Sequence, residues 1–433
     1  MVNQYQKKVL VMALFAGELM MKSGAEAYRV EETIERICRA CRIDYVECFA
    51  ITTGIFLSID SGKNDEDTHT FVKRINNTDI DLDKISQLNN FSRQFTTTDL
   101  SIDEGFQQLK IIAKYPTFSV PIKILGAIMV GLTLCFVLGG GVTDSLCAGV
   151  IGGCIYSISM LVDRLDFPKF IRTFVGCAIC ALMAIILYEL GICEILAPVI
   201  TASMSIYLPG VAITNAARDM LSGDMLSGVS KFAEAILLAL GIAGGVGLIL
   251  KFYSLWFSGH LVVVSSSHPL WIKGMCAIVA VLGFCILFNS PRKTIPYACI
   301  VGAMGQIVMQ HMLFLGQSPA IACFTGACTL ALLSELGSRA GRDATTIFII
   351  PGIIPLVPGS LLYSSMLQLL EGDMAASAAL AFSTLLTTLS IAAALVVVSS
   401  LTRLFVRITE RAKDASERKA REKEPNETED NSK

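Results

Sequence analysis

The stretch from residue 120 to residue 402 is unusually poor in charge. Its 283 residues include only 24 Asp, Glu, Lys and Arg. Soluble domains carry about a quarter of their residues as these four types, so the charge density here is about a third of the usual value. Charged side chains are costly in hydrocarbon, and such a stretch is typical of a membrane domain. The composition therefore argues against a soluble multidomain enzyme.

Apolar windows long enough to cross a bilayer recur throughout this stretch. A spanning helix needs about 17–25 predominantly apolar residues. Ten windows have this character, at about 120–141, 145–162, 170–190, 194–217, 229–250, 271–289, 294–313, 319–336, 344–369 and 375–401. We therefore expect a mainly α-helical, polytopic membrane protein with ten transmembrane helices.

Two polar regions flank the ten windows. The polar regions and the windows together divide the chain into five parts. The expected parts are a cytoplasmic α+β domain (1–119), a first five-helix repeat (120–250), an extracytoplasmic connector (251–270), a second five-helix repeat (271–401) and a charged cytoplasmic tail (402–433). The formal net charge of −2 carries no signature of a nucleic-acid partner. Most of the 14 cysteines lie in apolar windows, where a thiol is a small hydrophobe. We expect no metal and no cofactor.

The Lys and Arg residues of the short loops indicate the orientation, because cytoplasmic loops carry an excess of them. With residues 1–119 in the cytoplasm, the outside loops carry only Lys251 and Lys273. The inside loops carry Arg164, Lys169, Arg172, Arg218, Arg292, Lys293, Arg339 and Arg342. This bias fits ten spans with both termini in the cytoplasm.

A short phrase occurs twice in the membrane region. Pro209-Gly210 is followed by Gly223-Asp224, and Pro358-Gly359 is followed at the same spacing by Gly372-Asp373. The offset of 149 residues (358 − 209) lays the first five windows over the last five. Because five is odd, the copies must cross the membrane in opposite directions, as inverted repeats do in secondary transporters. The alternative is coincidence, since Gly, Pro and Asp are common turn formers.

The fourth window of each copy is interrupted by proline and glycine. Matching breaks of this kind indicate a binding site, because the freed backbone groups must face a polar cavity and a half-helix N-terminus can hold a carboxylate. The candidate substrate-binding residues are Thr201, Ser203, Ser205, Pro209, Gly210, Thr214 and Asn215 in the first copy, and Pro351, Gly352, Pro355, Pro358, Gly359 and Ser360 in the second. The alternative is that the breaks only kink helices and the hydroxyls bond to their own helix.

Acidic residues in or near the windows are candidates for proton coupling. Glu234 lies inside its window and is the first choice, whereas Glu194, Asp343 and Glu335 lie at or near window ends. An ionisable group within the bilayer is often a proton carrier. For Glu194 and Asp343, the alternative is that the side chain reaches the interface.

The N-terminal region is expected to form a small α+β domain. Two helices over 5–43 should break at Ser23-Gly24 with Ser23 as a possible cap, and a two-stranded hairpin over 45–60 should precede helices near 80–94 and 99–114. Ser23, Glu26, Arg29, Glu31 and Thr52 are candidate site residues, although a solvated helix face is the favoured alternative. The region has no Walker loop, zinc ligand set or nucleophile elbow.

The segment LMMKSGAEAYRVEET, from Leu19 to Thr33, and the TTGIF that begins at Thr52 resemble the start of the threonine/serine exporter family. The resemblance extends over nearly the whole chain: the part before about residue 270 resembles the larger component of the family and 270–402 the smaller one, here fused. It implies efflux across the bacterial plasma membrane, of threonine and serine in some members and of succinate-like dicarboxylates in others. A hydrolase-like activity has been suggested for the N-terminal domain, but no triad here supports it.

These observations favour a secondary transporter that exports a small carboxylate-bearing metabolite and uses the proton-motive force. Its expected partners are the lipid bilayer, an amino acid or dicarboxylate substrate, protons and, as a possibility left open, further copies of itself. A membrane-anchored enzyme or a sensor that uses the N-terminal domain is the alternative of another class. The paired repeat argues against both, because an anchor does not need two inverted halves.

Overall fold

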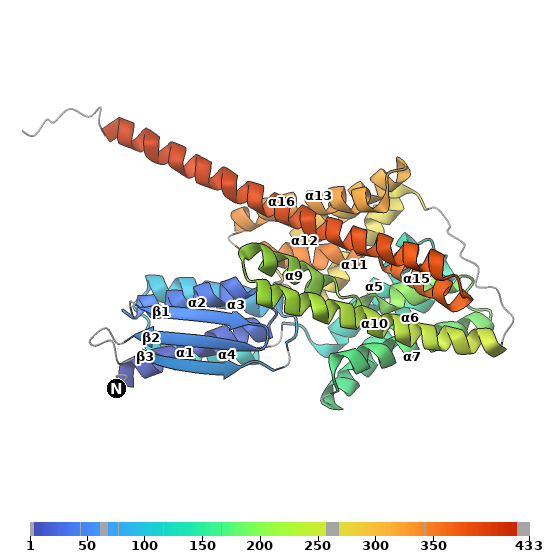
Figure 1. Ribbon diagram of the computed structural model, residues 1–433, viewed down its shortest axis with the longest axis horizontal. Helices are drawn as coiled ribbons and strands as arrows, with labels where there is room; N and C mark the ends of the chain where they lie inside the picture. Colours follow the sequence, from blue (N-terminus) through green and yellow to red (C-terminus); the bar gives the residue numbers. More distant parts are fainter. Residues whose placement is uncertain are drawn as a thin grey trace, which may run out of the picture.

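The computed structural model describes residues 4–421 except 44, 61–67, 77, 116, 166, 257–267 and 342. Most of the predicted connector and the end of the predicted tail therefore lie outside the described residues, as does Arg342. The rest of the chain forms a small α+β module followed by a large helical bundle (Figure 1).

The module consists of four helices and a three-stranded sheet. Its elements are α1 (Gln4–Lys22), α2 (Ala27–Ala40), β1 (Val46–Ile51), β2 (Gly54–Asp60), β3 (Thr68–Arg74), α3 (Leu82–Thr97) and α4 (Ile102–Lys114). The sheet is antiparallel in the order β1-β2-β3, with Phe49 opposite Phe56 and Phe56 opposite Val72. One face buries Ile55 and Leu57 against the helices, as the alternation of apolar residues requires.

Two details of this module differ from the prediction. The expected hairpin gains a third strand, β3, whose polar THTFVKR sequence gave little apolar signal. The residue that precedes α2 is Glu26, not Ser23, and Ser23 lies in the turn where Gly24 takes a positive φ of 83°. That left-handed conformation ends α1 and is easy only for glycine.

The bundle confirms the predicted membrane class. Its helices are α5 (Val120–Val137), α6 (Val142–Val162), α7 (Lys169–Glu189), α8 (Leu196–Ser203), α9 (Gly210–Ser222), α10 (Met225–Trp256), α11 (Leu270–Leu287), α12 (Ile295–Phe314), α13 (Pro319–Gly341), α14 (Thr346–Ile353), α15 (Gly359–Glu371) and α16 (Met374–Arg421). Three short 3₁₀ turns, η1 (Asp163–Leu165), η2 (Met204–Tyr207) and η3 (Ile354–Leu356), connect some of them. Within the described residues, nine helical segments are long and apolar enough to cross a membrane, and the pair formed by α8–η2 and α9, bent by 51°, makes a tenth.

The helices fall into two copies of one pattern. α5 to α10 and α11 to α16 have the same order, and in each a short helix and a 3₁₀ turn lead to a proline before a 13-residue helix. These helices end at Gly223 and Gly372, with φ of 97° and 88°. The equivalent helices α10 and α16 run in opposite directions: α10 starts next to the module, whereas α16 starts at the opposite end of the bundle (Figure 1). The copies are therefore inverted repeats. We call the two ends of the bundle the domain end and the far end.

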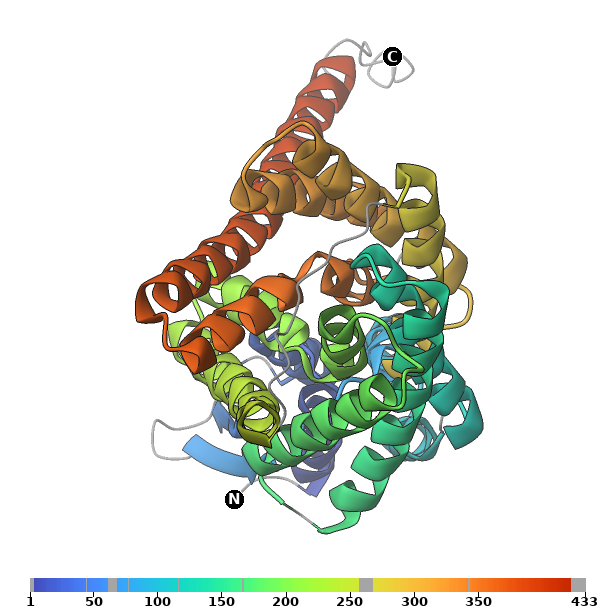
Figure 2. The same ribbon diagram turned by 90° about the vertical axis from the view of Figure 1, so that its right-hand side faces the viewer.

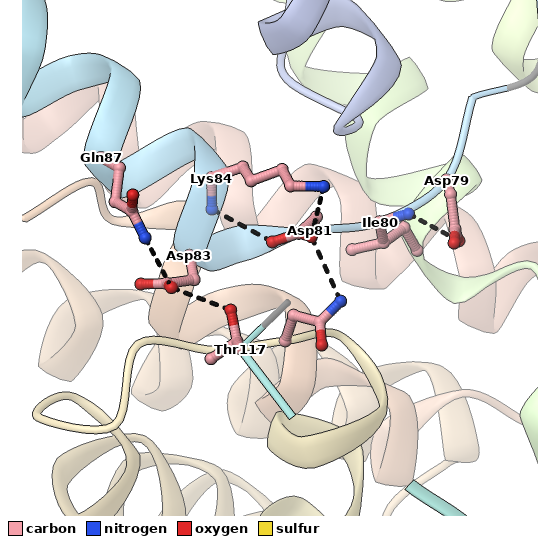
Figure 3. Close-up of polar contacts among 8 residues, drawn as sticks. Asp79, Ile80, Asp81, Asp83, Lys84, Gln87 and Thr117 are labelled. Carbon is pink, nitrogen blue, oxygen red and sulfur yellow. Dashed lines mark hydrogen bonds and ion pairs between the residues drawn. The ribbon is translucent and has the colours of Figure 1, made fainter. Parts of the chain in front are cut away.

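The module is docked on the second repeat through the start of α3. The N–H of Leu82 donates to the carbonyl of Phe288 (3.0 Å), and that of Asp83 to the carbonyl of Asn289 (2.8 Å). Asn289 Nδ2 donates to Asp81 Oδ2 (3.3 Å), while Asp83 Oδ2 accepts from Thr117 (Figure 3). The two backbone bonds fix the module to the loop after α11.

Further contacts reach both repeats. On the second repeat, Ser86 Oγ donates to Asp343 (3.0 Å). On the first, Asn215 Nδ2 donates to the carbonyl of Gly24 (3.1 Å), and the hydroxyls of Thr52 and Ser230 are 3.0 Å apart. The module thus bridges the two halves at the domain end.

Candidate functional site

The two interrupted spans contact each other at their breaks. α9 begins at Gly210 and α15 at Gly359, each directly after its proline. A Cβ added at Gly359 would lie 3.2 Å from Leu208 Cδ1, and a Cβ at Gly210 would lie 3.2 Å from Val357 Cγ2. Leu208 and Val357 are equivalent residues of the two repeats, so each repeat places the residue before its proline against the glycine of the other.

A cavity of about 540 Å³ lies between the module and the first break. We call it the domain-side cavity. Its walls come from α6, α7, the break, α10 and the end of α11, and the module closes one side with Gly24, Thr52 and residues 78–80. Its charged lining residues are Lys123, Lys169, Arg172 and Lys231 together with Asp79, Asp163 and Glu234.

A smaller cavity of about 210 Å³, the far-side cavity, lies at the second break. Thr201, Ser205, Gln306 and Thr387 are among its polar lining residues, and none of its described lining residues is charged. Leu208 borders both cavities, so the contact between the breaks separates them.

The two cavities are built from equivalent residues of the two repeats. On α6 and at the start of η1, the domain-side cavity is lined by Tyr156, Ser159, Met160 and Asp163. On α12, the far-side cavity is lined by Gln306, Met309, Gln310 and Leu313, each 150 residues further on (306 − 156). The same relation joins Phe284, Leu287 and Phe288 to Leu134, Val137 and Leu138. After the breaks the offset falls to 149, as between Leu238 and Thr387, because η3 is one residue shorter than η2. The cavities are therefore pseudo-symmetric.

Charge distinguishes the two cavities. Lys169 Nζ lies 2.6 Å from Glu234 Oε1, and Arg172 pairs with Asp163. Lys231 extends to Asp219, with Nζ 2.7 Å from the fully buried Oδ2 carboxylate. The residues of the second repeat at the positions equivalent to Lys169, Asp163, Lys231 and Glu234 are uncharged: Pro319, Leu313, Leu380 and Ser383. Identical architecture thus carries different chemistry on the two sides.

The predicted substrate residues divide into cavity-lining and packing residues. Pro209 and Asn215 line the domain-side cavity, and Thr201, Ser205, Pro355, Pro358, Gly359 and Ser360 line the far-side cavity. Gly210 lies at the contact between the breaks. The hydroxyls of Ser203 and Thr214 donate to carbonyls of their own helices, Pro351 is buried inside α14, and Gly352 packs against Gly302.

The predicted proton-coupling residues are spread over both ends of the bundle. Glu234 lines the domain-side cavity and is paired with Lys169. Asp343 is nearly buried at the domain end, 3.0 Å from Lys293 Nζ. Glu194 is exposed before α8, where its backbone N–H donates to Asp144, and Glu335 is half-buried on α13. Of these four residues, Glu234 is the one that lines either of the two cavities described above.

The candidate residues of the module do not gather in one place. Glu26 is buried and pairs with Arg29 (3.1 Å), while Glu31 accepts from the Ala50 N–H (2.8 Å). Ser23 is buried in the turn after α1. Thr52 is the member of this set that lines the domain-side cavity.

Sequence reasoning missed two polar residues that line the cavities, Lys231 and Gln306, and the buried partner of Lys231, Asp219. Asp219 and Lys231 form a buried ion pair between α9 and α10, and Gln306 is buried at the far-side cavity. Asp219 and Lys231 fall just outside or at the ends of apolar windows, where charge is ordinary. Applying the repeat offset to every polar residue would have singled out Lys231 and Gln306, because their equivalents, Leu380 and Tyr156, are of a different chemical kind.

Carboxylates crowd the junction of the module with α9 and α10. Burial raises the pKa of Glu31, the Ala50 N–H opposes that rise, and the nearby Asp224 adds to it. Burial and Asp219 likewise raise the pKa of Asp224, against the effect of Lys231. The folded protein therefore holds these protons more tightly than the unfolded chain does.

This crowding predicts a pH-dependent stability. An acid whose folded-state pKa is raised stabilises the fold less as the pH rises through that range, because the unfolded chain binds fewer protons there. We expect Glu31→Gln to raise the melting temperature at about pH 8 and to have a smaller effect near pH 5. Glu32→Gln, at the exposed neighbouring carboxylate paired with Arg36, is the control. A lower melting temperature for Glu31→Gln at the higher pH would contradict the argument.

Comparison with known proteins supplies the family. A family model described as "Putative threonine/serine exporter" matches residues 11–253, and a second, "Threonine/Serine exporter, ThrE", matches residues 273–401. No solved structure matches the chain.

Among curated proteins, the chain is similar to two exporters and to one subunit of another transporter. It is 21% identical over 380 residues to the "Probable threonine/serine exporter" of Mycobacterium tuberculosis, covering 85% of this chain and 71% of that protein. It is 22% identical over 367 residues to the "Threonine/serine exporter" of Corynebacterium glutamicum, covering 83% and 75%. It is 23% identical over 262 residues to the "Probable succinate transporter subunit YjjP" of Escherichia coli, covering 59% and 98%. Since the first family model alone covers more than half of the chain, this multi-pass membrane protein belongs to the threonine/serine exporter family.

Proposed function

We propose that this protein exports threonine- or serine-like amino acids by alternating access, with the module on the cytoplasmic side. The observation that carries the proposal is the pair of pseudo-symmetric cavities on opposite sides of one contact between the breaks. When inverted repeats exchange conformations, the cavity on one side closes as the equivalent one opens. The larger domain-side cavity corresponds to the state that faces the cytoplasm.

The chemistry at the breaks favours a substrate without net charge. The first N–H groups of a helix have no partner within it, and Val211 and Ser360, each in the first turn of its half-helix, line the two cavities. These N–H groups can hold one carboxylate. The described lining of the far-side cavity supplies no cation for a second carboxylate, so a zwitterionic amino acid fits better than a dianion.

A dicarboxylate exporter is the second candidate. The domain-side cavity has four cationic lining residues against three acidic ones, which would attract an anion from the cytoplasm. The similarity to a succinate transporter subunit agrees with this alternative. A membrane-anchored enzyme is less well supported, because the relatives are named as transporters and the candidate residues of the module are scattered.

Glu234 is the proposed proton carrier. It lies at the cavity wall with its carboxylate on Lys169, whose Nζ also donates to Thr78 of the module (3.0 Å). Protonation of Glu234 would weaken the ion pair that joins α10 to α7. Proton entry would thereby change the contacts that close this cavity, which is what coupling requires.

Efflux from loaded vesicles tests the proposed function. We expect vesicles that contain the protein to release labelled threonine and serine faster than empty vesicles, and an uncoupler to remove the effect of an imposed proton gradient. Faster release of succinate, with no change for the amino acids, would establish the dicarboxylate alternative. No change for any of the three substrates would overturn the proposal.

A further inference from the structure

Gln306 occupies an unusual position for an amide. It lies on α12, in a membrane-spanning helix, is 1% exposed, and lines the far-side cavity. Neither its Nε2 nor its Oε1 has a hydrogen-bond partner among the described residues. Buried side-chain amides nearly always have partners, so this one needs an explanation.

Three other polar side chains of the cavity are already engaged. Gln310, one turn further along α12, accepts from Lys273 Nζ (3.0 Å). The hydroxyls of Ser205 and Thr387 donate to carbonyls of their own spans. Gln306 therefore stands out among the amides of the cavity, because both of its polar atoms remain available.

A buried amide without hydrogen bonds destabilises the fold, because no hydrogen bond compensates for the free energy lost when the amide leaves water. An apolar side chain of similar size would be better for stability alone. The equivalent residue of the first repeat is Tyr156, at the wall of the domain-side cavity, so the fold does not require an amide at this position. The amide is thus explained by a ligand rather than by packing.

We propose that Gln306 is a specificity-determining residue that binds the transported molecule in the far-side cavity. Its Nε2 donates to a carboxylate or hydroxyl oxygen of the substrate, and its Oε1 accepts from an ammonium or hydroxyl group. An amide offers both functions without net charge, which suits a zwitterionic, hydroxyl-bearing amino acid. This inference rests on the proposed function for the identity of the substrate, but not for the existence of the site.

The test compares three variants of the purified full chain. Gln306→Met keeps the length of the side chain and removes both polar atoms. Gln306→Glu keeps the shape and adds a negative charge. Ser334→Ala is the matched control, because Ser334 Oγ is also buried and unpartnered but lines neither cavity.

We expect Gln306→Met to melt at a higher temperature than the wild type without ligand and to lose the stabilisation that threonine confers. Its efflux of threonine should fall roughly tenfold or more, as is typical when a hydrogen bond to a charged group is lost. Gln306→Glu should also lose threonine efflux, because it repels the carboxylate. Ser334→Ala should export threonine like the wild type.

The outcomes separate this inference from the proposed function. If the wild type exports threonine and Gln306→Met does so equally well, the inference is wrong and the proposed function stands. If the wild type moves none of the tested substrates, the proposed function fails. The melting temperatures without ligand then decide whether Gln306 belongs to a ligand site. A higher value for Gln306→Met than for the wild type supports such a site, and a lower value overturns it.

Discussion

Replacing Pro358-Gly359 by Ala-Ala is expected to abolish export while leaving the protein inserted and folded. Proline at this position has no N–H and ends the preceding turn, so α14 and α15 remain separate helices. With two alanines the span can close into one continuous helix. The added Cβ at residue 359 would also lie 3.2 Å from Leu208 and 3.5 Å from Thr201, so the contact between the breaks would shift.

The expected size of this effect is roughly a hundredfold loss in the initial rate of threonine efflux, since a displacement of about 1 Å at a site can cost that much. Insertion is checked by the yield of monodisperse protein, and transport by loaded vesicles. Pro269→Ala is the control, because Pro269 also directly precedes a helix, α11, but lines neither cavity. Normal efflux by the Ala-Ala variant would show that the break at Pro358 is not part of the transport site.

The substitution Lys231→Leu should produce the largest loss of stability. The Asp219 carboxylate is fully buried, accepts from Ser227 (2.8 Å) and lies 2.7 Å from Lys231 Nζ. Removing the cation leaves a buried charge without compensation, which costs about 3–5 kcal/mol. The melting temperature in detergent should fall accordingly.

A double variant distinguishes the ion pair from simple packing. Lys231→Leu with Asp219→Asn removes both charges, and the equivalent pair of the second repeat, Gln368 and Leu380, shows that the fold accepts a neutral pair there. We expect the double variant to recover most of the lost stability, because replacing a whole buried pair is often close to neutral. If the stability losses of Lys231→Leu and Asp219→Asn, each measured alone, simply add in the double variant, the residues are not coupled and the assignment of the pair is incorrect.

Much of the architecture could be predicted from the sequence. The ten apolar windows correspond to the membrane-length segments, and the interrupted fourth window of each copy is broken at Leu208-Pro209 and Val357-Pro358. These features depend on local chemistry: hydrocarbon excludes charge and unpaired backbone groups, and proline cannot continue a helix. The third strand was missed because its burial comes from pairing with β2, which a polar sequence does not reveal.

The sites were harder to predict than the spans. Thr201, Ser203 and Ser205 have similar side chains within five residues, yet Thr201 and Ser205 line the far-side cavity and Ser203 does not. Likewise, nothing in the sequence near Gln306 shows that its neighbours Gln310 and Thr387 are already engaged. Whether a polar group is free depends on its rotamer, as for Thr387, and on partners from distant segments, as for Gln310.

The sequence by itself determined the membrane class and the positions of the two breaks, because each follows from properties of contiguous residues in hydrocarbon. It also predicted the inverted repeat, from a phrase that recurs after 149 residues (358 − 209). The tertiary structure alone decided that the breaks meet, that equivalent residues line two opposed cavities, and that charge gathers in one of them. Contacts such as Leu208 with Gly359, or Asn215 with Gly24, join residues more than a hundred positions apart. Their geometry is set by how whole helices pack, which no local pattern encodes.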